Sequence, residues 1–169
     1  SRQSRGLGDV YKRQIQDHTN SNTALVIDNA GRVTQPNKPM ASVSRSGDMA
    51  AHTGTSYPTL IFNQVDLDVG GHYNNSTGVF TCPIAGIYQV TCFGMDTNSS
   101  AAGAFYMRLE KNGVQYGSLV GSYVNYGSHQ GGSGTWLTSC TAGNTLEIGY
   151  YATSGVQGSY TGATFMLIG

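Results

Sequence analysis

Asp66 and Asp68 are the first residues whose types and spacing suggest chemistry. They stand two positions apart, so an extended segment would carry both carboxylates on one face. Carboxylate oxygens in such positions are ligands that calcium prefers, and the pair is therefore a candidate calcium site. The alternative is structural, because an aspartate such as Asp68 also caps turns by accepting hydrogen bonds from backbone N–H groups. The sequence leaves both interpretations open and indicates no other cofactor.

The histidines and the sequence motifs do not indicate an enzyme. The chain has no G-x-S-x-G nucleophile elbow, no H-E-x-x-H zinc motif and no phosphate-binding P-loop. Its four histidines stand in scattered polar contexts: His18, His52, His72 and His129. We therefore assign no catalytic residue and expect a protein that binds a partner.

The three cysteines, Cys82, Cys92 and Cys140, do not have the spacing of a zinc site. Zinc needs four ligands at short spacings, and the chain has no C-x-x-C pair. Each cysteine lies in an apolar or strand-like run, so we expect buried free thiols. A disulfide between Cys82 and Cys92 is the alternative.

Two stretches rich in Tyr and Gly, 112–134 and 153–162, form the candidate binding surface. They are built almost wholly from Gly, Ser, Tyr, Asn, Gln and Val. Antibody loops use these residues because Tyr offers a large amphipathic contact area at low entropic cost. Four residues are expected to lie on exposed loops and to contact a cell-surface glycan or protein: Tyr123, Tyr126, His129 and Tyr160. The alternative is that the stretches are solvated connections, with Tyr116 and Tyr123 buried as ordinary strand residues.

The composition indicates the framework that must position these side chains. Charged residues make up 11% of the 169-residue chain, whereas Gly occurs 24 times and Tyr 11 times. This profile is typical of a single β-rich domain with uncharged polar loops, since a disordered chain carries more charge and fewer aromatic residues. No apolar run approaches the roughly 18 residues of a membrane-spanning helix. Membrane insertion is therefore not expected.

Residues 1–14 are interpreted as foreign to the natural protein. The stretch SRGLGDVYKRQ, residues 4–14, matches the translation of the transposase-end adapter of shotgun sequencing libraries. We expect a library artefact on an incomplete metagenomic reading frame; the alternative is a short basic arm for nucleic acid. Outside residues 1–14, five of the nine basic and eight of the nine acidic residues remain. This mildly acidic balance argues against nucleic acid as a partner.

The rest of the chain divides into two parts, 15–40 and 41–169. The first is expected to form a hairpin, with strands at 24–27 and 32–34 on either side of a D-N-A-G turn and a Pro-containing linker after them. A two-stranded hairpin is marginal alone, so we expect a short β stem made with copies of itself.

Residues 41–169 alternate between apolar and polar side chains over many short runs, and clusters of Gly, Asn and Ser separate the runs. The K-N-G sequence at 111–113 predicts a hairpin turn. The fold class expected is all-β, an antiparallel jelly-roll β-sandwich. Eight side chains are expected in its core: Tyr88, Val90, Phe105, Met107, Leu109, Trp136, Leu146 and Ile148.

The segment from 62 to 92 resembles the signature of the C1q-type globular head, a family within the TNF-like jelly-roll superfamily. Six residues stand at the intervals of that signature: Phe62, Asp68, Tyr73, Phe80, Gly86 and Tyr88. Val90 and Cys92 replace its last two aromatic residues, and Asn144 stands where the family usually has Asp. The resemblance covers 41–169. All six have a structural explanation. The rings of Phe80 and Tyr88, on either side of the 83–86 turn, are expected to enter one interior. Gly86 is expected to permit a tight backbone.

The resemblance implies a homotrimer that recognises a partner outside the cell. The segment ALVIDNAGRVTQPNKP, residues 24–39, is similar to the β segment before C1q-type knobs in marine phage structural proteins. The expected function is that of the receptor-binding knob of a phage tail fibre or similar virion appendage. Its expected partner is a host cell-surface glycan or protein, and its expected location is the virion or the extracellular space. The alternative is a secreted C1q-like lectin or scaffold protein of bacterial or animal origin.

Overall fold

The computed structural model divides the chain into two compact units, residues 1–38 and 39–169. One of the four candidate binding residues, Tyr126, lies outside the residues that the structure describes. The described residues are 13–16, 23–27, 30–97, 102–124 and 129–169.

The first unit contains a three-stranded antiparallel sheet in the order β1-β2-β3. Its strands are β1 (Arg13–Gln16), β2 (Thr23–Ile27) and β3 (Val33–Thr34). The two strands expected from the sequence correspond to β2 and β3. β1 is an additional strand, and it includes Arg13 and Gln14 of the adapter-like segment, which pair with Ile27 and Val26.

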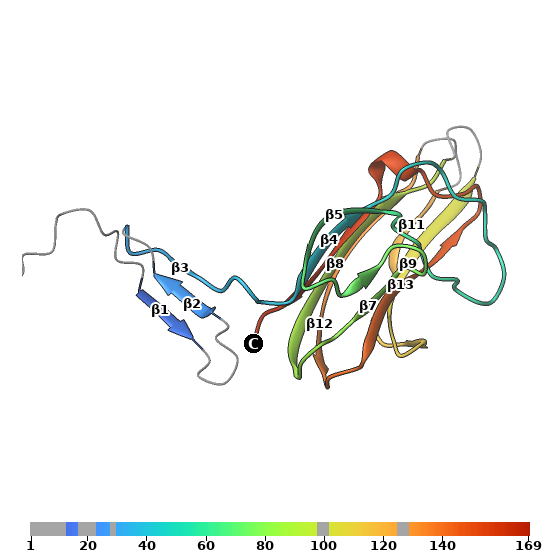
Figure 1. Ribbon diagram of the computed structural model, residues 1–169. Helices are drawn as coiled ribbons and strands as arrows, with labels where there is room; N and C mark the ends of the chain where they lie inside the picture. Colours follow the sequence, from blue (N-terminus) through green and yellow to red (C-terminus); the bar gives the residue numbers. More distant parts are fainter. Residues whose placement is uncertain (1–12, 17–22, 28–29, 98–101, 125–128) are drawn as a thin grey trace, which may run out of the picture. The chain divides into compact units, whose positions relative to one another are not determined.

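The second unit is a sandwich of two antiparallel sheets (Figure 1). The six-stranded sheet has the order β10-β9-β13-β7-β6, and β11 pairs with the same edge of β9 as β10. Its strands are β6 (Tyr73–Asn74), β7 (Val79–Thr81), β9 (Gly103–Lys111), β10 (Val114–Gln115), β11 (Val120–Val124) and β13 (Thr145–Ala152).

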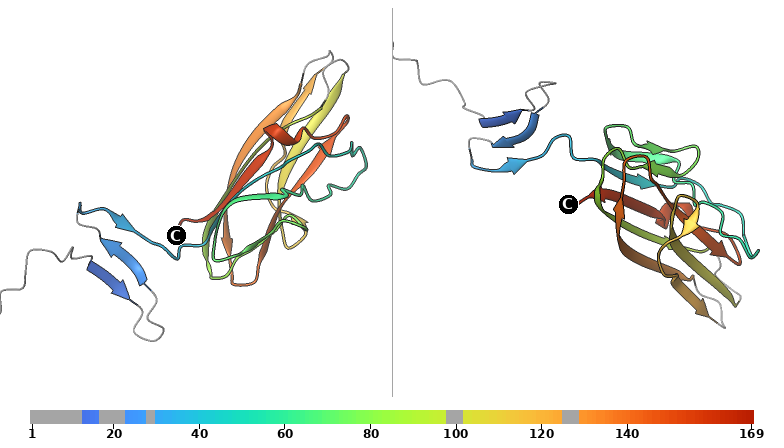
Figure 2. Two further views of the ribbon diagram at one scale, coloured as in Figure 1. Left: turned by 45° about the horizontal axis from the view of Figure 1, so that its top comes forward. Right: turned by 90° about the horizontal axis from the view of Figure 1, so that it is seen from below.

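The five-stranded sheet has the order β12-β8-β14-β4-β5. Its strands are β4 (Met40–Ser44), β5 (Gln64–Val69), β8 (Gly86–Met95), β12 (Gly131–Cys140) and β14 (Gly162–Leu167). A single short 3₁₀ helix, η1 (Gly158–Tyr160), is found among the described residues, and it lies away from the C-terminus (Figures 1 and 2). No helix among these residues is long and apolar enough to span a membrane. The all-β jelly-roll sandwich expected from the sequence is confirmed.

The core lies between the two sheets and contains the side chains expected from the alternating pattern. Seven of the eight expected residues are fully buried, and Trp136 is half-buried against the core. Trp136 differs because it lies on the edge strand β12, where Gly117 and Gly134 make room for its ring. The interior therefore follows the period-two pattern except at the edge of a sheet.

The signature residues contact one another. The Asp68 carboxylate accepts a hydrogen bond from the backbone N–H of Tyr73 at 3.0 Å. The Tyr73 hydroxyl in turn donates to the carbonyl oxygen of Phe62 at 3.2 Å. The rings of Phe80 and Tyr88 pack edge to face, with their centroids 6.0 Å apart. These contacts agree with the structural roles that the sequence predicts for the set.

Gly86 allows both its backbone conformation and a close contact. Its φ of 159° is one that residues with a side chain rarely adopt. A Cβ there would also lie 2.5 Å from Leu167 Cδ1 and 2.6 Å from the carbonyl oxygen of Gly169. The end of the chain therefore fits against the start of β8 only because position 86 lacks a side chain.

The hairpin turn expected at 111–113 is confirmed. Asn112 and Gly113 have φ angles of 53° and 73°, as a two-residue type I′ turn requires. The turn returns the chain as β10, which pairs with the end of β9.

Candidate functional site

A buried aspartate, Asp96, organises the end of the sandwich that carries η1. Asp96 follows β8 directly and is 0% exposed. Its Oδ1 accepts a hydrogen bond from the backbone N–H of Gln130 at 2.8 Å, and its Oδ2 accepts one from the Ser154 hydroxyl at 3.2 Å. Its own backbone N–H donates to the Gln130 carbonyl oxygen at 2.8 Å. We call this end, composed of residues 95–97, 129–130 and 154–160, the apical cluster.

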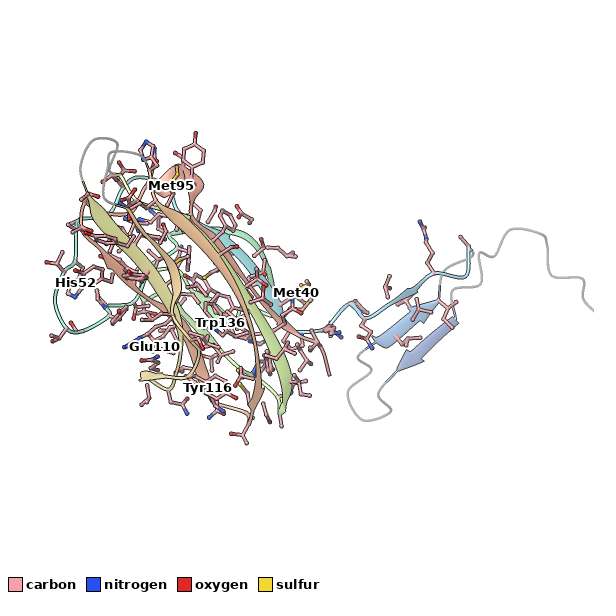
Figure 3. The ribbon with its side chains drawn as sticks, turned by 180° about the vertical axis from the view of Figure 1, so that it is seen from behind. Met40, His52, Met95, Glu110, Tyr116 and Trp136 are labelled. Carbon is pink, nitrogen blue, oxygen red and sulfur yellow. The ribbon has the colours of Figure 1, made fainter. Side chains whose placement is uncertain are left out.

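Two of the predicted binding residues, His129 and Tyr160, lie in the apical cluster. His129 Nδ1 lies 3.1 Å from the carbonyl oxygen of Asp96, and 39% of the His129 side chain is exposed. Tyr160 ends η1 and is 57% exposed. The backbone N–H of Gln157 ties this region to β8 by donating to the Met95 carbonyl oxygen at 2.8 Å, and Figure 3 labels Met95 beside η1. The structure thus presents both predicted side chains to solvent at one end of the molecule.

Tyr123 lies on a strand and not on the loop expected. It belongs to β11, opposite Ala104 of β9, and is 59% exposed. The strand can form because Gly121 allows close approach, since a Cβ there would overlap the carbonyl oxygen of Phe105. Tyr116 is exposed as well. The alternative that Tyr116 and Tyr123 are buried strand residues is therefore wrong for this chain.

Sequence reasoning missed Asp96 and the buried amides near it. Gln130 is 2% exposed, and both its Oε1 and its Nε2 have no hydrogen-bond partner among the described residues. The buried Oε1 of Gln157 likewise has none there. The apical cluster therefore keeps hydrogen-bonding capacity that this part of the protein does not use. One signal was available, because Asp96 is the only Asp, Glu, Lys or Arg between Asp68 and Arg108.

The two aspartates of the candidate calcium site make separate contacts. Asp68 accepts hydrogen bonds from the backbone N–H groups of His72 at 2.9 Å and Tyr73 at 3.0 Å, as the structural alternative predicts. Asp66 is exposed at a bulge between β4 and β5 and accepts a hydrogen bond from the Ser44 hydroxyl at 3.3 Å. The described part of the chain contains no group of three or more His, Cys, Asp or Glu side chains placed to hold a metal. Calcium binding at this pair stays a prediction.

All three cysteines are free and buried, as expected, and the alternative bridge between Cys82 and Cys92 is not formed. The Cys92 thiol lies 3.8 Å from the sulfur of Met107. Burial raises the pKa of Cys92 to about 12. Burial, and then the thiol of Cys140, raise the pKa of Cys82. Because only the thiolate is a strong nucleophile, neither residue is suited to nucleophilic catalysis near neutral pH.

Two of the remaining histidines have structural surroundings. His52 Nε2 forms a hydrogen bond with the carbonyl oxygen of Ser56 at 2.9 Å, and its ring packs against Tyr150; Figure 3 labels it. The His72 ring packs edge to face with Phe80, with centroids 6.2 Å apart. His52 Nε2 also lies 3.3 Å from the exposed Ser56 hydroxyl. Among the described residues, neither ring has a hydrogen bond to a carboxylate that would complete a catalytic set.

The outward face of the five-stranded sheet has little charge, and its exposed Asp66 lies on the edge strand β5. Four of its five strands, β4, β8, β12 and β14, contain no Asp, Glu, Lys or Arg. Its exposed large apolar side chains on β8 and β12 are Ile87, Phe93 and Leu137. The register aligns Leu137, Gln89, Met166 and Met40 in one row across these four strands. We call this surface the uncharged face. Exposed apolar side chains on a face with so little charge are typical of an interaction site.

Comparison with known proteins identifies the same family and fold that the signature residues suggest. The model of the C1q domain family matches residues 42–160. The globular domain of zebrafish complement 1qA is 18% identical to the chain, with a TM-score of 0.62 and coverage of 78% of this chain and 98% of that one.

Two TNF-type structures are also similar in fold. Eiger TNF from S. frugiperda is 9% identical, with a TM-score of 0.56 and coverage of 79% of this chain and 94% of that one. Murine APRIL is 10% identical, with a TM-score of 0.55 and coverage of 78% and 99%. At these identities, the similarity concerns the fold alone.

Proposed function

The chain belongs to the C1q domain family, and from this premise we propose that it is a non-enzymatic, homotrimeric recognition module. Domains of this family are generally binding modules without enzymatic activity, and they commonly form trimers. Proteins that carry them are typically extracellular. In the proposed trimer, residues 15–40 of three chains join into a short stem.

The uncharged face is the observation that supports the proposed trimer. On a monomer, Ile87, Phe93 and Leu137 would stay in water, whereas burial stabilises such side chains by roughly 1.5–3 kcal/mol each. Because β4, β8, β12 and β14 contribute no charged group, a partner that covers this face desolvates no charge on them. A closed cyclic assembly buries one such face on every chain and leaves no copy uncovered.

We place this module at the distal end of a phage tail fibre or a similar virion appendage. The support is the β segment at residues 24–39, which resembles the segment before phage knobs. The genes beside the full-length reading frame test this placement, because tail or capsid genes would support it. A Gly-X-Y stalk upstream would instead favour the secreted lectin or scaffold alternative.

The apical cluster is the proposed receptor contact. Asp96 fixes the backbone beneath it through Gln130 and Ser154, while His129 and Tyr160 are exposed above. A rigid base reduces the entropy that is lost on binding, and an exposed Tyr offers a large contact area. A trimer multiplies weak individual contacts into avidity.

The test is cell attachment by labelled full-length protein. We expect that changing Tyr126 and Tyr160 together to Ala abolishes attachment to susceptible cells while the melting temperature and the trimer mass stay unchanged. Tyr116→Ala, an exposed tyrosine outside the cluster, is the matched control and should attach like the parent. Parent-like attachment by the double variant would move the receptor site to another face without affecting the trimer proposal.

A further inference from the structure

The outward face of the six-stranded sheet carries a row of tyrosine rings. Tyr106 of β9 lies directly opposite Tyr151 of β13, and their ring centroids are 6.0 Å apart. The Tyr57 ring lies 6.2 Å from that of Tyr151, on a segment that runs along β13. β11 pairs with the other side of β9 (Figure 1), and its Tyr123 is exposed. We call the set of Tyr57, Tyr106, Tyr123 and Tyr151 the tyrosine face.

Small residues lie beside these rings on the neighbouring strands. Gly121 of β11 pairs with Tyr106, and Ala104 of β9 pairs with Tyr123. Because neither neighbour has a bulky side chain, the adjacent strand leaves the rings uncovered. Tyr106 is partly exposed and Tyr123 is 59% exposed. The register therefore leaves Tyr106 and Tyr123 accessible to a ligand.

The hydroxyl groups distinguish this set from the tyrosines of the core. Each core tyrosine donates its hydroxyl to a backbone carbonyl oxygen; these are Tyr73, Tyr88 and Tyr150. Within the described chain, the hydroxyls of the tyrosine face have no hydrogen-bond partner. Water therefore satisfies these hydroxyls, and a ligand with hydroxyl groups can replace that water.

Arg108 and Glu110 of β9 form the polar border of the tyrosine face. Arg108 Nε and Nη2 donate to Glu110 Oε1 at 2.8 and 2.6 Å, and the guanidinium carbon lies 4.0 Å from the centroid of the Tyr57 ring. Figure 3 labels Glu110. Glu147 of β13 accepts a hydrogen bond from the Thr59 hydroxyl at 2.7 Å. One arginine and two glutamates give this border no positive excess that would attract an acidic ligand.

We propose that the tyrosine face binds an uncharged oligosaccharide. Aromatic rings suit the apolar C–H faces of sugars, and free tyrosine hydroxyls together with the Arg108–Glu110 pair suit their hydroxyl groups. Consecutive rings about 6 Å apart can contact more than one sugar unit of a linear chain.

The inference deepens the proposed recognition function and rests on it for its biological setting. It assigns a site apart from the apical cluster and apart from the uncharged face, so a trimer would present three copies on its outside. Saccharide binding in solution can nevertheless be measured whether or not the protein attaches to cells.

The experiment is calorimetric titration of the full-length protein with cellopentaose, laminaripentaose and chitopentaose, which are neutral, and with pentagalacturonate, which is acidic. We expect at least one neutral pentasaccharide to bind and the acidic one to bind at least about tenfold more weakly. Tyr151→Ala and Tyr106→Ala should each weaken the neutral interaction about tenfold or more, because each removes a ring contact. Two variants are used so that one remains informative if the other unfolds. Tyr116→Ala should bind like the parent.

Three results would overturn the inference: no binding of any neutral pentasaccharide at millimolar concentration, binding that both ring variants retain, or tighter binding of the acidic sugar. Its failure is separable from failure of the proposed function. Loss of cell attachment in the variant with Tyr126 and Tyr160 changed to Ala, with no saccharide binding by the parent, would refute the tyrosine face alone. The protein could instead bind a saccharide through Tyr151 and yet be monomeric and fail to attach to cells. That result would support the tyrosine face and refute the proposed function.

Discussion

Tyr88 shows how a single signature residue supports the core. Its ring is fully buried against Phe80, and its hydroxyl donates to the carbonyl oxygen of Ile84 at 2.9 Å. Tyr88→Ala removes the ring and should lower the free energy of unfolding by about 3–5 kcal/mol. Tyr88→Phe removes only the hydrogen bond and should lower it by about 1 kcal/mol. Denaturant titration measures the loss in each variant. Equal losses would contradict the conclusion that the buried ring contributes more than the hydrogen bond.

Asp96 should matter to stability through the donors that it satisfies. Asp96→Ala leaves the buried backbone N–H of Gln130 without its acceptor, which costs about 1–3 kcal/mol. Asp96→Asn keeps an acceptor oxygen and should cost less. Amide hydrogen exchange at Gln130 reports the effect locally, and we expect faster exchange in the Ala variant. Unchanged exchange there would show that Asp96 does not hold the apical cluster together.

The buried thiols and tyrosines predict a loss of stability at alkaline pH. Burial raises the pKa of Tyr73 and of Cys92 to about 12, whereas the unfolded chain releases these protons near pH 10 and roughly 8.5. Between these limits the unfolded state binds fewer protons, so the free energy of unfolding should fall as pH rises from about 9 to 12. Denaturant midpoints across this range measure it. Cys92→Ala should make the decline shallower, and an unchanged slope would contradict the assignment.

At the scale of elements, the attachment of β11 depends on one glycine. A Cβ at Gly121 would overlap the Phe105 carbonyl oxygen, so Gly121→Ala should cost about 3 kcal/mol or more by forcing the strands apart. The control is Gly113→Ala, because position 113 has a φ of 73° but a Cβ added there would meet no atom within 4 Å. Gly113→Ala should lower the free energy of unfolding by only roughly 1–2 kcal/mol, the cost of placing a side chain on left-handed backbone. Similar melting temperatures for the two variants would contradict the steric argument.

The long strands could be predicted from the sequence, and the short or glycine-rich ones could not. β8 and the middle of β9 alternate because one side of each packs on the core. β1 reads R-Q-I-Q and β11 reads V-G-S-Y-V, so neither has such a pattern, and pairing with a neighbour is what makes them strands. The same limit explains why Tyr123 was expected on a loop.

The candidate site was predictable only where composition alone decides exposure. His129 and Tyr160 stand in polar, glycine-rich surroundings and are exposed, as expected. The role of Asp96 depends on segments far apart in the chain, which only the fold brings to it. The pairing of Tyr106 with Tyr151 likewise depends on register, which a single sequence does not specify for two strands so distant from each other.

At the scale of the whole molecule, the two outward faces of the sandwich differ in chemistry. The uncharged face consists of small polar and apolar side chains, whereas the opposite sheet presents tyrosines bordered by Arg108 and Glu110. An assembly that buries the first and exposes the second uses both. Burial of one face and exposure of the other both depend on self-association. The central claim is therefore that the protein is a trimer.

Light scattering on the 169-residue chain at micromolar concentration tests that claim most directly. We expect a mass about three times the 17.9 kDa of one chain. Leu137→Glu places a charge on the uncharged face and should shift the mass toward the monomer. Val114→Glu changes an equally exposed apolar residue on β10 and should leave the trimer intact. A monomer mass for the parent protein, or a Leu137→Glu variant that stays trimeric, would contradict this account.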